Sequence, residues 1–150
     1  MEKRKCRIRM VQEKNNYCLC SILSDILLDS KIIISQRDIA QKLTSTQKGF
    51  KADDNKIKEF MKKNGFEYTF YWWNQTPLNE PDSLLKEISE HQGFIGLKNH
   101  AYRVLEFEDP MITVLDPANC TESPRDFSYS YLMHMLREVD GGFGLIKYIH

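Results

Sequence analysis

The sequence predicts an α+β fold, with helices in the first part of the chain and mostly antiparallel strands after them. Apolar residues recur at helical spacing up to residue 61, whereas most segments from residue 66 onward are short β-prone runs separated by turns. No internal repeat or linker divides the 150 residues, so we expect a single domain, residues 1–150. The order of elements favours a helical lobe packed on a sheet lobe, with a cleft between them.

Three helices are expected first. One spans residues 18–30. Ser35 begins the second with a capping-box-like pattern, Asp53 or Asp54 caps the third, and Gly65 stands where that helix ends in the left-handed conformation. The residues expected on the inner helix faces are Leu19, Ile22, Leu23, Ile26 and Leu27, then Ile39, Ala40 and Leu43, then Ile57, Phe60 and Met61.

The strands are expected in the second part of the chain, where β-branched and aromatic residues alternate with turn signals. A short helix is expected at 82–90 and a longer one at 126–139, which the Asp140-Gly141-Gly142 turn ends. The expected strands are residues 66–73, 94–97, 101–107, 111–115 and 143–149.

The composition excludes several function classes. The 21 Lys and Arg residues balance the 21 Asp and Glu residues, so no field of one sign favours nucleic acid as a partner. No apolar run approaches the roughly 18 residues of a membrane span, and no apolar stretch follows the basic residues 3–5 as a signal peptide requires. We therefore expect a cytoplasmic protein, or one on the cytosolic side of a membrane.

The 4 cysteines show neither the spacing of a disulfide framework nor that of a zinc site, which predicts reduced thiols. The sequence also lacks a Gly-rich phosphate loop, a His-x-x-x-His pair and a cluster of acids suited to a metal. We expect neither a cofactor nor a metal.

Cys18 is the candidate nucleophile, because it falls in the first turn of the first expected helix. Unpaired backbone N–H groups and the positive end of the helix dipole favour an anion there, so the thiol is expected to lose its proton more easily. Gln12 can bring an amide donor to the same point. That donor and the Cys18 backbone N–H would form an oxyanion hole. Cys20 lies deeper in the helix and is interpreted as a core residue.

His100 and Asp116 are the candidate base and orienting acid. His100 opens one expected strand and Asp116 closes the next. If these strands form an antiparallel hairpin, both residues reach the same end of the sheet. His91, His134 and His150 lack such a context. A nucleophile, base and orienter in this order have the logic of a papain-like thiol hydrolase.

These residues together resemble the C39 peptidases. The similarity rests on Gln12 with Cys18 six residues later, then His100 at a strand start, then Asp116-Pro117 after the following strand, and it covers nearly the whole chain. C39 peptidases are papain-fold domains of ABC transporters that export bacteriocins and other peptides. The resemblance implies a Cys18–His100–Asp116 triad, cleavage after a double glycine, a leader-peptide substrate, and a transporter membrane domain in the full-length protein.

Two alternatives stay open at this point. A protein glutamine deamidase or a ubiquitin-directed hydrolase of the same architecture would use the same triad, because each passes through a thioester. A non-catalytic domain that only binds a leader peptide would keep the fold, although it would not need all three triad residues.

Overall fold

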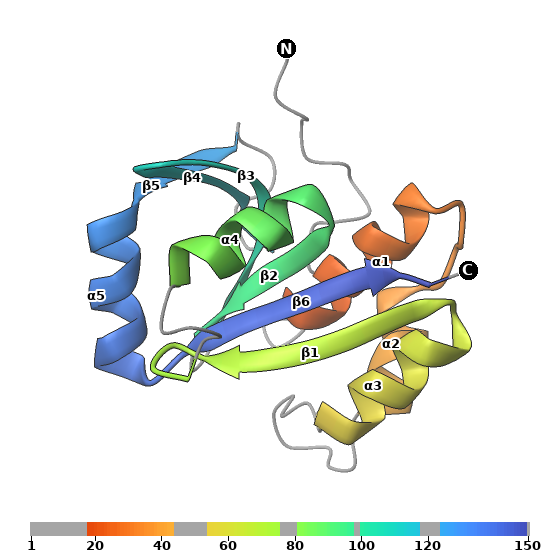
Figure 1. Ribbon diagram of the computed structural model, residues 1–150. Coiled ribbons are helices and arrows are strands. Elements are labelled where there is room, and N and C mark those ends of the chain that lie inside the picture. Colours follow the sequence, from red (N-terminus) through yellow and green to blue (C-terminus); the bar gives the residue numbers. More distant parts are fainter. Residues whose placement is uncertain (1–17, 44–53, 76–80, 98–99, 118–123, 150) are drawn as a thin grey trace.

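An antiparallel sheet with the strand order β1-β6-β2-β3-β4-β5 forms the centre of the molecule (Figure 1). The structure is a computed structural model that describes residues 18–43, 54–75, 81–97, 100–117 and 124–149. The helices are α1 (Cys18–Asp29), α2 (Gln36–Leu43), α3 (Asp54–Lys63), α4 (Pro81–Glu90) and α5 (Tyr129–Val139). The strands are β1 (Phe66–Trp72), β2 (Gln92–Gly96), β3 (Ala101–Glu108), β4 (Met111–Leu115), β5 (Arg125–Ser128) and β6 (Gly142–Tyr148).

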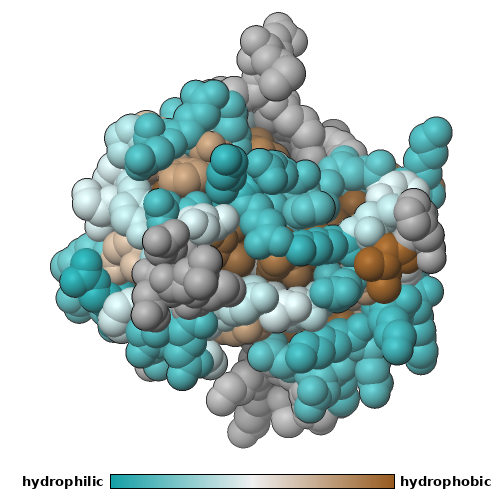
Figure 2. All heavy atoms as spheres, in the orientation of Figure 1, coloured by the Kyte–Doolittle hydropathy of each residue, from teal (hydrophilic) through white to brown (hydrophobic). Residues whose placement is uncertain are grey.

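Two apolar cores lie on opposite faces of this sheet. Helices α1, α2 and α3 contribute to one core, and α4 and α5 contribute to the other. Successive residues of β3 divide between the faces, because Arg103 contacts α1 whereas Val104 belongs to the core under α4 and α5. Hydrophilic side chains cover much of the face of the molecule that Figure 2 shows. The expected α+β class, with a helical lobe on an antiparallel sheet, is confirmed.

The helical half follows the sequence closely. Helix α1 begins at Cys18, and its inner residues Ile22, Leu23, Ile26 and Leu27 are fully buried. The Ser35 hydroxyl accepts a hydrogen bond from the Asp38 backbone N–H at 3.1 Å, which satisfies an otherwise unpaired donor at the start of α2. After α3, Gly65 adopts a φ of 89°, as expected of a glycine at a helix end.

The segment from residue 125 differs from the expectation. The predicted helix 126–139 was wrong at its start, because residues 125–128 form strand β5 and the helix begins only at Tyr129. Ser128 explains the boundary, since its extended backbone precedes the helix and its side chain accepts from the Tyr131 N–H at 3.2 Å. Asp126 lies opposite Thr113 on β4, whose hydroxyl hydrogen bonds its carboxylate at 2.6 Å. β5 is thus the edge strand that pairs with β4, and this side-chain contact adds to the pairing.

Strands β3 and β4 form the expected antiparallel hairpin, with Arg103 opposite Leu115. His100 immediately precedes β3, and Asp116 immediately follows β4. The register therefore brings both residues to the same end of the sheet, as predicted.

Gly144 of β6 marks a position where the sheet has no room for a side chain. It lies opposite Phe94 of β2, and a Cβ added to Gly144 would approach Phe94 Cε1 to 2.3 Å. The Phe94 ring is itself buried, so it cannot move aside without disturbing the core. We expect Gly144→Ala to lower the free energy of unfolding by about 1–3 kcal/mol, measured by urea denaturation.

Gly96→Ala is the matched control, because a Cβ at Gly96 would meet its nearest neighbour at an ordinary 3.5 Å. We expect its free energy of unfolding to stay within about 0.5 kcal/mol of the wild-type value. Equal losses in both variants would contradict the packing of Phe94 over Gly144.

Candidate active site

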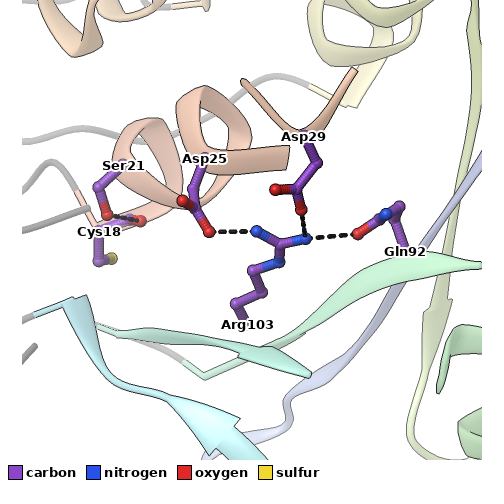
Figure 3. A network of polar contacts seen from close by, with 6 residues as sticks. All are labelled: Cys18, Ser21, Asp25, Asp29, Gln92 and Arg103. Atoms are coloured by element: carbon purple, nitrogen blue, oxygen red, sulfur yellow. Dashed lines mark hydrogen bonds and ion pairs between the residues drawn. The ribbon is translucent and has the colours of Figure 1, made fainter. Parts of the chain in front are cut away.

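Cys18 is the first residue of α1 and is partly buried. Its carbonyl accepts a hydrogen bond from the Ser21 hydroxyl at 2.8 Å (Figure 3). Hydrogen bonding from three backbone groups lowers the pKa of the Cys18 thiol: those of Leu19, Ala101 and Cys18 itself. The first and last belong to the start of the helix, as the sequence predicted. Ala101 is the residue after His100, so the thiol lies beside the first residue of β3.

The net pKa of the Cys18 thiol nevertheless moves in the opposite direction from the expectation. Burial raises the pKa more than the backbone hydrogen bonds lower it, and the negative charge of Asp116 raises it further. The prediction that this thiol loses its proton more easily was therefore wrong in its net direction. The helix start does favour the thiolate, but desolvation outweighs it, so the neutral thiol is favoured at this place.

His100 and Asp116 are in direct contact. His100 Nε2 lies 2.6 Å from Asp116 Oδ1, and the side chains of the two residues are 24% and 5% exposed. The His100 and Tyr102 rings pack in a T-shaped arrangement, at 4.7 Å between ring centroids. A nearly buried carboxylate on one ring nitrogen fixes the orientation of the imidazole.

Arg125 is a second partner of Asp116 that the sequence analysis missed. Its Nη1 lies 3.3 Å from Asp116 Oδ2, so the two carboxylate oxygens face different donors. Arg125 begins β5, whose residues 126–128 the sequence predicted to be helical. The guanidinium also lies over the Phe127 ring, at 5.3 Å from its centroid.

Cys20 and His134 lie in places that do not suit catalysis. Cys20 is fully buried, and burial raises the pKa of its thiol to about 12, in agreement with a core role. His134 is 69% exposed on α5, where it faces Glu138. Gln12 lies outside the described residues. The structure therefore brings His100 and Asp116 together and puts Cys18 beside Ala101.

Neither a metal site nor a membrane span is found in the described parts of the chain. No group of three or more His, Cys, Asp or Glu residues there could hold a metal ion. No helix there is long and apolar enough to cross a membrane.

Solved structures share this architecture. One is a double-glycine-motif protease from an AMS/PCAT transporter in complex with the leader peptide, with a TM-score of 0.67 and 15% identity over 92% of this chain and 89% of that one. Another is the peptidase domain of Streptococcus ComA, a bifunctional ABC transporter of a quorum-sensing pathway, with a TM-score of 0.65 and 17% identity over 91% of this chain and 95% of that one.

The chain has the fold of a double-glycine peptidase domain. At these identities the similarity lies in the backbone and the order of elements. No protein-family model matches the sequence, and neither does any curated protein. The double-glycine peptidase fold agrees with the C39 resemblance that Gln12, Cys18, His100 and Asp116 carry.

The raised pKa of the Cys18 thiol leads to a prediction about its reactivity. In a His100→Ala variant we expect alkylation of Cys18 by iodoacetamide to increase through a midpoint above the ordinary thiol value of about 8.5. The sign follows from the cause: burial favours the neutral thiol, so reactivity is lost as the pH falls through this raised pKa. The wild-type domain should retain reactivity at lower pH, because the imidazole of His100 can take the thiol proton and pair with the thiolate. The pH dependence of alkylation is measured for both proteins by intact mass spectrometry. Identical pH profiles would contradict an effect of His100 on the thiol.

Proposed function

We propose that this chain is a cysteine peptidase that cleaves a leader peptide after a Gly-Gly motif. The observation that carries the proposal is the position of the Cys18 helix start and the contacting His100–Asp116 pair in a double-glycine peptidase fold. Cys18 is the nucleophile, His100 the base, and Asp116 the residue that orients it. Gln12 and the backbone N–H of Cys18 form the oxyanion hole.

The proton transfers follow from which ring nitrogen is engaged. Asp116 holds His100 Nε2, so Nδ1 is the nitrogen that takes the proton of the Cys18 thiol. The thiolate attacks the carbonyl carbon of the second glycine, and the oxyanion is held by backbone and amide N–H groups. His100 then returns the proton to the leaving amine as the C–N bond breaks. Water, deprotonated by the same imidazole, hydrolyses the thioester and restores the thiol.

The raised thiol pKa makes the His100–Asp116 pair central to this scheme. Because burial and Asp116 both disfavour an isolated thiolate at Cys18, the reactive form is a thiolate paired with an imidazolium. Asp116 stabilises that imidazolium from its far side. The same carboxylate thus disfavours the thiolate when the imidazole is neutral and favours the ion pair when it is protonated.

The partners follow from the same fold. One similar structure contains a leader peptide, and both belong to transporters. We propose that the substrate is a peptide whose leader ends in Gly-Gly and that the domain acts on the cytosolic side of a membrane, with an ABC transporter membrane domain.

The purified domain can be tested with synthetic peptides that contain a leader ending in Gly-Gly, with products identified by mass spectrometry. We expect two fragments from cleavage after the second glycine, and none when either glycine is replaced by valine. Absence of cleavage of every glycine-ended peptide would overturn the proposal. Release of ammonia without fragments would instead indicate a deamidase, and binding without any reaction would indicate a leader-binding module.

A further inference from the structure

A buried ionic cluster joins the helix that carries Cys18 to the strand that follows His100. The guanidinium of Arg103 on β3 contacts the carboxylate of Asp25 on α1 through Nη1. Its Nη2 lies 2.5 Å from Asp29 Oδ2, also on α1, and 2.6 Å from Gln92 Oε1 on β2. Figure 3 shows the guanidinium between these three side chains, with Cys18 on the same helix.

The cluster and the nucleophile share one stripe of α1. Asp25 and Asp29 follow Cys18 by seven and eleven residues, and at 3.6 residues per turn both return to nearly the same direction as Cys18. On β3, Ala101 and Arg103 are two residues apart and face the same side of the sheet. Helix and strand therefore meet at two points: the Cys18 thiol lies beside the Ala101 backbone, and the Asp25 and Asp29 carboxylates bind Arg103.

Burial of this cluster costs free energy, because charged groups lose their hydration. Arg103 is 2% exposed and Asp25 is fully buried, so both charges have left water. Arg103 Nε is also buried, and within the described part of the chain it has no hydrogen-bond partner. Apolar side chains of similar volume often stabilise such a place as well or better. Apolar side chains do not make directional contacts. A planar guanidinium that bonds two carboxylates does, and it fixes both the rotation and the axial position of the helix.

We propose that Arg103, with Asp25 and Asp29, is a positioning residue that sets the register of α1 against β3 and thereby aligns Cys18 with His100. The inference rests on the proposed function of Cys18 and His100. The geometry supports it, because a slide or rotation of α1 would move the thiol along the same strand that begins one residue after His100. Misplacement by about 1 Å is enough to lower a catalytic rate about 100-fold.

The decisive variant removes the two most deeply buried charges and keeps the volume of their side chains: Asp25→Leu combined with Arg103→Met. Arg103→Met alone leaves Asp25 buried without its guanidinium and is expected to unfold more easily, whereas the double variant should keep the wild-type melting temperature. We expect the folded double variant to cleave a Gly-Gly peptide with a kcat 10- to 100-fold below wild type and a KM within about threefold. A folded double variant with a wild-type kcat would overturn the proposal and leave the cluster a structural tie only.

A second variant keeps the test decisive if the double variant does not fold. The Asp29 side chain is 29% exposed. Asp29→Ala therefore adds no buried charge on α1 to those that the wild type already has. We expect it to melt normally and to lower kcat about 3- to 10-fold. Glu87→Ala is the matched control, because it removes a 2.5 Å ion pair with Lys147 between α4 and β6 and should leave kcat unchanged. A kcat in Asp29→Ala equal to that of Glu87→Ala would overturn the proposal.

Alkylation of Cys18 separates this inference from the proposed function. The pH profile of alkylation needs no peptide, and in wild type it should depend on His100. We expect the double variant, or Asp29→Ala, to shift that profile toward the profile of His100→Ala, because the thiol is no longer aligned with the imidazole. An unchanged profile would overturn the positioning role. If the alkylation profile of the variants shifts but the wild-type domain cleaves no glycine-ended peptide, the positioning role of Arg103 is supported and the proposed peptidase function is rejected.

Discussion

Cys18→Ala is expected to abolish cleavage of a Gly-Gly leader peptide, with a loss in kcat of about 10⁴-fold or more. The thiol supplies the only bond between enzyme and acyl group in the proposed pathway, and an alanine methyl cannot replace it. The fold should survive, because Cys18 is partly buried at a helix end and loses only one sulfur atom. Cleavage measured by mass spectrometry, together with a thermal melt of each variant, tests both statements.

Cys20→Ala is the matched control for this loss. It makes the same chemical change two residues along the same helix, at a thiol that is fully buried and whose pKa is raised to about 12. We expect the Cys20 variant to keep kcat within about threefold and to lose some stability through the small cavity that it leaves. Cleavage that persists in Cys18→Ala, or that disappears only in Cys20→Ala, would assign the nucleophile elsewhere.

The parts of the site that could be predicted from sequence depend on local signals. A cysteine that opens an apolar helical stripe, and a histidine and an aspartate that flank a hairpin, each occupy a place that neighbouring residues define. The register of β3 and β4 then brings His100 and Asp116 together without information from the rest of the chain. Helix α1 could be located for the same reason, because its fully buried Ile22, Leu23, Ile26 and Leu27 repeat at helical spacing.

The net pKa of Cys18 could not be predicted, because it depends on tertiary packing. The helix start contributes in the expected direction, but the amount of water removed from the thiol is set by elements distant in the chain. Strand β5 was missed for a related reason. Its four residues pair with β4 in an antiparallel ladder, and so short a run carries no periodic signal.

The sequence contains a pattern that indicates the Arg103 cluster once the structure is known. Asp25 interrupts the apolar stripe of α1, and Arg103 interrupts the otherwise mostly apolar start of β3. Two opposite charges at positions that should be buried predict a pair, since an isolated buried charge is not tolerated. Which carboxylate meets which guanidinium is decided by the packing of α1 on β3, and therefore only by the fold.

Asp116→Asn is expected to lower kcat about 100-fold or more, and the reason lies in the two donors that Asp116 faces. Its Oδ1 contacts His100 Nε2 and its Oδ2 contacts Arg125 Nη1. An asparagine has one oxygen for these two positions. With its oxygen toward His100, its NH₂ group faces the guanidinium, donor against donor. With its oxygen toward Arg125, its NH₂ group faces Nε2, so the ring proton moves to Nδ1 and His100 cannot take the Cys18 proton.

This conflict predicts that a second substitution restores part of the lost activity. Arg125→Ala removes the competing donor, so the asparagine of the double variant can turn its oxygen toward His100 and keep the productive tautomer. We expect Asp116→Asn with Arg125→Ala to exceed Asp116→Asn alone about tenfold in kcat, whereas Arg125→Ala by itself should change kcat less than about fivefold.

Asp126→Asn is the control for this pair, because it makes the same change at a β5 carboxylate that accepts from Thr113, and it should leave kcat within about threefold. Steady-state cleavage rates of the four variants decide the matter. If losses from Asp116→Asn and Arg125→Ala simply multiply, the two donors do not compete for one carboxylate. Asp116 would then act on His100 through its charge alone, and the tautomer of the imidazole would not depend on Arg125. A partial rescue requires instead that the orientation of the residue-116 side chain determine which nitrogen of His100 carries the proton.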